Sequence, residues 1–326
     1  MLYKDAGVDI RKAEDSLSEI KRLIKKTLTN NVLNSPGHFG ATYKIPEGYK
    51  NPVLVSSIDG VGTKILLAIE HGYHEGLGHD IVNHCVNDIL VMGAKPMYIL
   101  DYFASGKLDK DVITEVVKGM AIACKENECS LIGGETAEMP DLYGNNIFDL
   151  AVQITGIVEQ DKIIDGSRIE EGDKVFGLPS SGFHTNGYSL IRAIIKKAGL
   201  SLGDYIKELS GVLGDLLLVP HKSYYKEVFP FLDKIKGICH ITGGGFYGNI
   251  PRILSEGLTC YIDPGSFKVT RLFRFFQEKG GIPEREMFSV FNMGIGMILV
   301  CKENIGLGIE IGKIKKGDVP VEINGI

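Results

Sequence analysis

The chain has 326 residues, of which 44% are hydrophobic and 24% are charged, and its formal net charge is −5. This composition excludes a disordered chain, and the length predicts about two domains. Because the balance is acidic and no basic run exceeds two residues, we expect no nucleic-acid partner. The N-terminus lacks the apolar core of a signal peptide, no apolar stretch is long enough to cross a bilayer, and the six cysteines form no CxxC pair. These features predict a cytoplasmic protein with reduced thiols and no membrane partner.

The first half of the chain alternates between strand and helix patterns. It predicts strands at 52–58, 96–104, 130–132 and 147–158, and helices at 80–92 and 109–127. A polar, turn-rich segment at 161–173 follows. We place the domain boundary there, which gives domains of residues 1–165 and 166–326.

The second half repeats this style with less regular spacing. Its predicted strands are 173–178, 237–242, 258–263 and 293–300, and its predicted helices are 187–198, 221–234, a segment running to Leu254, and 270–278. The apolar stretch from Met287 to Cys301 predicts a buried strand. Several strands follow one another without a helix between them. We therefore expect an α/β (α+β) fold of mixed sheets with helices packed on one face, rather than a parallel doubly wound sheet.

One face of the predicted helix at 80–92 carries short polar side chains. Asp80, His84, Asn87 and Asp88 are spaced i, i+4, i+7 and i+8, so they share a face. A solvated face is one interpretation. Because the stripe contains no lysine, arginine or glutamate, a set of ligands held in fixed geometry is the other.

The segment from Ser57 to Lys64 leaves the first predicted strand. Asp59 stands at the strand end, where ligand sites of α/β folds collect. Gly60 and Gly62 would let backbone N–H groups approach an anion, and Lys64 adds a positive charge. The spacing is not that of a Walker A loop, and a glycine turn with an incidental lysine is the alternative.

A second glycine pair follows the strand predicted at 130–132. Gly133 and Gly134 precede Glu135 and Thr136, which suits a phosphate or ribose contact, although a simple turn has the same pattern. Glu135 completes a set of hard oxygen ligands with Asp59, Asp80 and Asp88, and Asp101 is a further candidate. Such a set favours Mg²⁺ with a nucleotide over zinc. The spacing of His71, His74, His79 and His84 fits no common zinc pattern.

Two glycine loops mark the second half. The segment 180–187 (SSGFHTNG) lies between a strand and a helix, where N–H groups and small hydroxyls suit a phosphate. The alternative is that Thr185 or Asn186 only caps the helix. The segment 243–248 matches GxGxxG, and Asp263 lies 20 residues beyond its first glycine, as in dinucleotide sites. Its place late in the chain argues against NAD, because too few residues follow for further βαβ units.

At these motifs the sequence resembles the phosphoribosylformylglycinamidine cyclo-ligase family, also called aminoimidazole ribonucleotide (AIR) synthetases. The matching blocks are residues 3–10, 59–64, 85–88, 133–140, 165–167, 181–190 and 242–246. The loop at 38–41 also matches, with His38 where a small residue is expected. Selenophosphate synthetases share the core but usually carry an N-terminal cysteine, and no cysteine precedes Cys85 here. A kinase of the thiamine-monophosphate type and a non-catalytic nucleotide-binding module are further alternatives.

The resemblance implies two domains, with the N-terminal halves of a homodimer pairing into a barrel. It implies ATP-dependent ring closure of formylglycinamidine ribonucleotide to AIR through an iminophosphate, with ATP and Mg²⁺ as cofactors and Asp59 and Asp88 as metal ligands. It implies nucleotide contacts from Asp59, Gly60, Gly62, Thr63, Lys64, Asp80, Asn87, Asp88, Gly133, Gly134, Glu135 and Thr136. The implied substrate contacts are Ser181, Gly182, His184, Asn186, Gly243, Gly244 and Gly245, with Lys64 and His184 as catalytic residues.

Overall fold

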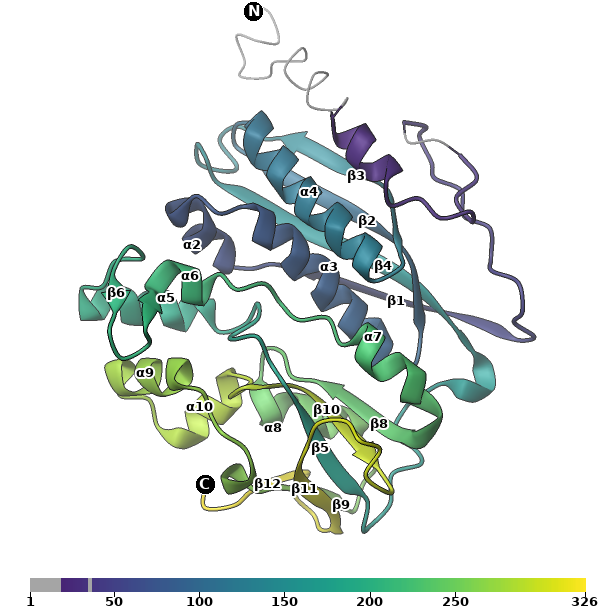
Figure 1. Cartoon of the computed structure of the whole chain (residues 1–326), viewed down its shortest axis with the longest axis vertical. Coiled ribbons are helices and arrows are strands. Elements are labelled where there is room, and N and C mark those ends of the chain that lie inside the picture. Colours follow the sequence, from purple (N-terminus) through teal and green to yellow (C-terminus); the bar gives the residue numbers. More distant parts are fainter. Residues whose placement is uncertain (1–18, 35–36) are drawn as a thin grey trace, which may run out of the picture. The chain divides into compact units, whose positions relative to one another are not determined.

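The computed structural model describes residues 19–34 and 37–326, so the matching block at 3–10 lies outside the described residues. Two compact units emerge (Figure 1). The first contains the described residues up to Ile89 and Ala94–Gln160, and the second contains Leu90–Gly93 and Asp161–Ile326. Each unit has its own sheet, and each is described by itself below.

The first unit is built on a four-stranded sheet. Its strands, in spatial order, are β1 (Pro52–Gly60), β4 (Phe148–Glu159), β2 (Lys95–Ser105) and β3 (Ser130–Glu138). Only β2 and β3 pair in parallel, and α4 (Lys110–Glu126) forms their crossover. β3 is longer than the predicted strand at 130–132. Gly133 to Thr136 therefore lie inside a strand and not in a turn, because β2 continues to pair with them.

Helices α2 (Lys64–His71), α3 (Glu75–Leu90) and α4 cover one face of this sheet (Figure 1). Asp109 caps α4 by accepting hydrogen bonds from the backbone N–H groups of Asp111 and Val112. α3 and α4 touch through their backbones: a Cβ atom at Gly78 would lie 2.1 Å from a carbonyl oxygen of α4, and one at Gly119 would lie 2.0 Å from a carbonyl oxygen of α3. α2 was not predicted, because eight residues are too few for a clear helical period.

The opposite face of the first sheet carries exposed apolar side chains. Leu54 and Ile58 project from β1, with Ile58 71% exposed, and Leu100 and Tyr102 project from β2. The sheet register carries this face across the strands, since Ile58 pairs with Gln153 and Gln153 with Leu100. An exposed apolar face of this kind is typical of an interaction surface.

The second unit contains a mixed sheet. Its strand order is β12 (Val321–Ile323), β9 (Leu258–Ile262), β11 (Ile309–Lys316), β5 (Lys174–Pro179), β10 (Ile295–Cys301) and β8 (Ile235–His240), beside a small hairpin of β6 (Tyr205–Ile206) and β7 (Gly211–Val212). Its helices are α5 (Tyr188–Ala198), α6 (Leu213–Leu217), α7 (Tyr225–Val228), α8 (Gly245–Asn249), α9 (Arg271–Gly280) and α10 (Glu284–Val290). Only β12 and β9 pair in parallel. The expectation of mixed rather than purely parallel sheets is confirmed.

Two predicted elements of the second half are wrong in part. The helix at 221–234 reduces to α7 and a 3-10 turn at Phe229–Lys234, because Pro230 supplies no N–H to continue an α-helix. The stretch from Met287 to Cys301 is not one strand: α10 ends at Val290, and a turn with positive φ at Met293 and Gly294 precedes β10. The six cysteines are all free and buried. In the described part of the chain, no helix has the length and apolarity needed to cross a membrane.

Candidate functional site

The first cluster of candidate residues lies where the C-terminal end of β1 meets α3. His84 Nε2 lies 3.0 Å from Asp59 Oδ2 and 3.6 Å from Asp88 Oδ2. Ser57 Oγ donates a hydrogen bond to the same Asp88 oxygen at 3.0 Å. The imidazole is buried, whereas the carboxylate side chains are 45% exposed at Asp59 and 23% exposed at Asp88. Both carboxylates therefore approach the same buried imidazole nitrogen, while each acidic side chain stays partly open to solvent.

His84 and Asp59 favour each other's charged forms. Burial alone would lower the pKa of His84, but its hydrogen bond to Asp59 and the charges of Asp88 and Asp59 raise that pKa above its ordinary value. Burial would raise the pKa of Asp59, but His84 and the Gly60 N–H, which donates to Asp59 at 2.6 Å, hold it below its ordinary value.

Lys64 and Asp80 form a separate, wholly buried ion pair. The Lys64 ammonium lies 2.8 Å from the Asp80 carboxylate, and both side chains are 0% exposed. Lys64 is the first residue of α2, and Asp80 lies on α3. The polar stripe predicted on this helix is thus divided, because Asp80 turns to Lys64 while His84 and Asp88 turn to β1. Asn87, from the same stripe, is buried.

The sheet register aligns residues from three of the motifs. Asp59 on β1 pairs with Val152 on β4, Val152 pairs with Asp101 on β2, and Asp101 pairs with Gly134 on β3. Paired residues point to the same face of a sheet, and neighbouring strands lie about 4.8 Å apart, so the backbones of Asp59 and Asp101 are about 10 Å apart. Motifs far apart in sequence therefore meet in one row across the sheet.

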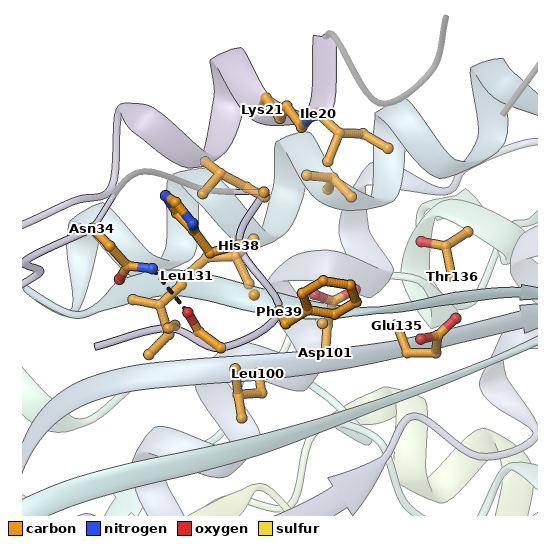
Figure 2. A pocket seen from close by; sticks show the side chains of 18 residues that line it. Ile20, Lys21, Asn34, His38, Phe39, Leu100, Asp101, Leu131, Glu135 and Thr136 are labelled. Carbon is orange, nitrogen blue, oxygen red and sulfur yellow. Dashed lines mark hydrogen bonds between the residues drawn. The ribbon is translucent and has the colours of Figure 1, made fainter. Parts of the chain in front are cut away.

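A cavity of about 540 Å³ opens at the β3 end of this row. Gly133, Gly134, Glu135 and Thr136 line it together with Asp101. The loop at 37–41 forms another wall, and Figure 2 shows its His38 and Phe39 side chains beside the cavity, with Asn34 Nδ2 donating to the Gly40 carbonyl at 2.8 Å. Asp59, His84 and Asp88 are not among the residues that line this cavity. The family match at 38–41 was the sequence signal for the loop.

The pKa of Asp101, which lines the cavity, is strongly shifted. Burial, together with the charge of Glu135, raises the pKa of Asp101 to about 7, although a backbone hydrogen bond opposes the shift. Gly134 makes this position possible, because a Cβ atom there would lie 2.1 Å from Asp101 Oδ1. Asp101 therefore exchanges a proton near neutral pH inside the cavity.

We expect Asp101→Asn to stabilise the protein at pH 8 but not at pH 4. In the folded state Asp101 keeps its proton up to about pH 7, whereas the unfolded chain loses it near pH 4. The folded state then binds more protons in this window, so this carboxyl lowers stability as pH rises, by up to about 4 kcal/mol. Urea denaturation at both pH values measures the difference. An equal change in unfolding free energy at pH 4 and pH 8 would contradict the shift.

In the second unit, the loop at 180–187 is held by its own hydrogen bonds. Ser181 Oγ donates to the Pro220 carbonyl at 2.6 Å, and Ser181 N donates to His184 Nε2 at 3.2 Å. Asn292 Nδ2 donates to the Gly182 carbonyl at 2.9 Å. α5 begins after Gly187 without a side-chain cap, so the alternative that Thr185 or Asn186 caps this helix is wrong. The loop presents polar groups that helix formation does not use.

A cluster of three buried histidines surrounds this loop. The His184 and His221 rings stack with their centroids 3.9 Å apart, and His221 Nε2 lies 3.0 Å from His240 Nε2. His184 has a left-handed backbone, with φ of +60°, an unusual conformation that is often retained at functional sites. His221 and His240 were not predicted, because neither belongs to a motif and only tertiary packing brings them to His184.

The glycine loop at 243–245 lies beside the same region. A Cβ atom at Gly243 would lie 3.4 Å from Asn186 Oδ1, so the two predicted substrate loops are neighbours. Gly245 is required by packing, because a Cβ atom there would lie 2.1 Å from the Phe288 carbonyl oxygen. α8 has only five residues, and β8 pairs in antiparallel fashion with β10. The dinucleotide interpretation of this loop, which needs a parallel βαβ unit, is therefore excluded.

Comparison with known proteins identifies the family. The sequence model of AIR synthase related proteins matches residues 39–158 with its N-terminal domain and residues 170–306 with its C-terminal domain. The chain belongs to the AIR synthase family. It is 51% identical over 302 residues to a phosphoribosylformylglycinamidine cyclo-ligase of Thermoanaerobacter pseudethanolicus, covering 92% of this chain and 90% of that protein. It is 50% identical over 300 residues to the enzyme of that name from Burkholderia ambifaria, covering 91% and 85%. The resemblance inferred from the motifs is confirmed.

Solved structures of other proteins share the fold. A thiamine-monophosphate kinase from Stenotrophomonas maltophilia superposes with a TM-score of 0.69 at 16% identity, covering 93% of this chain and 95% of that one. A hydrogenase maturation protein HypE in complex with ATP gives a TM-score of 0.64 at 17% identity, covering 93% and 89%. At such identities the likeness concerns the fold alone, and the predicted two-domain mixed α/β architecture is confirmed.

Proposed function

We propose that this AIR synthase family member is a phosphoribosylformylglycinamidine cyclo-ligase of purine biosynthesis. It closes the imidazole ring of formylglycinamidine ribonucleotide with ATP, giving AIR, ADP and phosphate. The observation that carries the proposal is the 51% identity over 92% of the chain to a relative of that name. We also propose a cytoplasmic location, which the six free cysteines support.

The reaction needs a carbonyl oxygen to become a good leaving group. Transfer of the γ-phosphoryl group of ATP to the amide oxygen of the substrate releases ADP and forms an iminophosphate. The neighbouring amidine nitrogen then attacks that carbon, the C–O bond breaks, and phosphate leaves as the ring closes. The main tasks of the protein are to hold the reactants in place and to stabilise negative charge.

We assign the nucleotide to the first unit. Gly133, Gly134, Glu135 and Thr136 line the 540 Å³ cavity, and we propose that they contact the phosphates or ribose. Gly60, Gly62, Thr63 and Asn87 follow from the family resemblance. Direct contact of Lys64 and Asp80 with ATP stays a prediction. Their complete burial favours a positioning role, in which the pair fixes α2 against α3.

We propose Asp59 and Asp88 as the residues that would hold Mg²⁺. Their carboxylates lie 3.0 and 3.6 Å from the same atom, His84 Nε2, so the fold brings two hard oxygen ligands close together. Both are partly open to solvent, which leaves room for water and phosphate oxygens. In that position Mg²⁺ would neutralise phosphate charge. Ser57 and His84 would orient the two carboxylates.

The substrate assignment rests on the second unit. We propose that Ser181, Gly182, His184 and Asn186 contact formylglycinamidine ribonucleotide, with the loop at 243–245. The buried Asn186 Nδ2 has no hydrogen-bond partner in the described part of the chain, which supports a polar ligand beside it. His184 remains the proposed catalytic residue here; its Nε2 accepts a backbone hydrogen bond, so its proton resides on Nδ1 in the neutral form.

One assay tests the proposed activity. The protein is incubated with ATP, Mg²⁺ and formylglycinamidine ribonucleotide, and ADP and AIR are measured. We expect equimolar ADP and AIR, and little ADP without the ribonucleotide. ADP formed with thiamine monophosphate and not with the ribonucleotide would instead identify a kinase.

We further propose that the apolar face of the first sheet pairs with the same face of a second copy. Leu54, Ile58, Leu100 and Tyr102 are exposed there, and Tyr43, Tyr98 and Leu54 border a recess of about 340 Å³ on it. Burying these side chains against an identical surface satisfies the hydrophobic effect without a different partner. We expect sedimentation velocity at micromolar concentration to give a dimer, and Ile58→Lys to give a monomer. A wild-type monomer under these conditions would contradict the proposal.

A further inference from the structure

A second, smaller cavity in the first unit has no role in the proposed reaction. Its volume is about 280 Å³, and it lies where the C-terminal end of β2 approaches α2 and the start of α4. The inner wall is apolar, with Phe103 and Phe148 stacked at 4.9 Å between ring centroids. Lys107, Asp109 and Asn146 are exposed and form its outer rim. A buried aromatic floor with a polar rim is typical of small-molecule sites.

One polar group belongs to the buried floor. Ser105 is 3% exposed and lines the cavity, and its Oγ has no hydrogen-bond partner in the part of the chain that the structure describes. Its backbone carbonyl accepts a hydrogen bond from Met139 N at 2.7 Å. A buried hydroxyl without a partner is costly unless a ligand or a water satisfies it.

The nearby ionisable group is already paired. His74 Nδ1 lies 3.1 Å from Glu115 Oε2, so this ring nitrogen already has a polar partner. Lys107 and Asp109 bring opposite charges to the rim. These two charges balance at the rim. Among the buried side-chain N and O atoms of the described residues that line the cavity, only Ser105 Oγ has no hydrogen-bond partner.

We propose that this cavity binds a neutral aromatic molecule of one or two fused rings that carries a single hydroxyl or carbonyl group. The ring would pack on Phe103 and Phe148, and its oxygen would bond to Ser105 Oγ. An apolar cavity of about 150 Å³ accepts benzene, so 280 Å³ accommodates a bicyclic ring. The proposal does not depend on the ligase activity or on the roles of the residues assigned to ATP.

Fluorescence titration with 1-naphthol, and with naphthalene as the probe that lacks the hydroxyl, tests the proposal. We expect wild-type protein to bind 1-naphthol with a Kd below about 1 mM, and Ser105→Ala to weaken it about three- to tenfold, the loss of one neutral hydrogen bond. Naphthalene affinity should not change in this variant. Ser105→Ala removes an unpaired hydroxyl, so its fold should be retained, which a thermal melt verifies.

A matched control uses Thr114, whose Oγ1 is also buried and unpartnered in the described structure but lies outside the cavity lining. Thr114→Val should leave 1-naphthol affinity unchanged. Val112→Phe, which fills the cavity, should abolish binding of both probes. Equal affinity of wild type and Ser105→Ala for 1-naphthol would overturn the proposal, as would no binding to the wild type, which would leave water as the partner of Ser105.

Discussion

Replacing Lys64 by methionine is expected to lower the free energy of unfolding by about 3–5 kcal/mol, the usual cost of removing one partner of a buried ion pair. Lys64 and Asp80 are both 0% exposed and lie 2.8 Å apart. Burial lowers the pKa of Lys64, although Asp80 opposes this effect. Without the ammonium, the Asp80 carboxylate must remain buried as an uncompensated charge or take up a proton. Urea denaturation of both proteins measures the loss.

The double variant Lys64→Met/Asp80→Leu is the matched control. Removing both charges leaves no uncompensated charge in the interior. The double variant should therefore recover much of the stability lost by Lys64→Met. The two interpretations of Lys64 then separate. If Lys64→Met kept wild-type stability and raised only the KM for ATP, direct phosphate contact would hold and the positioning role would be wrong.

The second large effect is expected for Asp88→Asn, which should reduce kcat by about 10²–10³-fold with a small change in Tm. Asparagine keeps the size of the side chain but loses the charge that would face Mg²⁺ and the developing phosphoryl charge. It also removes one of the carboxylates that raise the pKa of His84. The measurement is ATP turnover with formylglycinamidine ribonucleotide over a Mg²⁺ titration.

Ser57→Ala separates the charge of Asp88 from its orientation. That variant removes the 3.0 Å hydrogen bond to Asp88 and keeps the carboxylate, so we expect a loss of about tenfold or less. Wild-type turnover of Asp88→Asn at limiting Mg²⁺ would show that Asp88 is no metal ligand.

Local patterns predicted most strands and the longer helices of this fold. β1 and β4 were recognisable from their β-branched residues, and β2 from its aromatic and aliphatic residues. α4 was recognisable because its apolar period and its Asp109 cap agree. The register could not be predicted, since nothing in the local sequence aligns Asp59 with Val152 and Asp101. The length of β3 was missed for the same reason, because Gly133 and Gly134 are strand residues only through their pairing with β2.

The candidate residues were predicted better than their partners. Asp59, Asp88 and the Gly133–Thr136 segment lie in one unit, as their motifs indicated, but the helix spacing that grouped Asp80 with Asp88 could not show that Lys64 takes Asp80 into the interior. His221 and His240 were invisible, because a histidine outside a motif has no sequence signal until packing places it against another ring.

The contact between α3 and α4 at Gly78 and Gly119 gives the molecule an unexpected sensitivity. The two helices lie this close because neither glycine has a side chain. A single methyl group at either position would lie about 2 Å from a carbonyl oxygen of the other helix. Asp88 lies ten residues beyond Gly78 on the same helix, about 15 Å along its axis. Because α3 moves as a rigid unit, a shift of the helix at Gly78 also moves Asp88. Gly119→Ala, on α4, would therefore displace the Asp88 carboxylate from Asp59. The alignment of the acidic cluster is thus controlled from a point where no functional group exists.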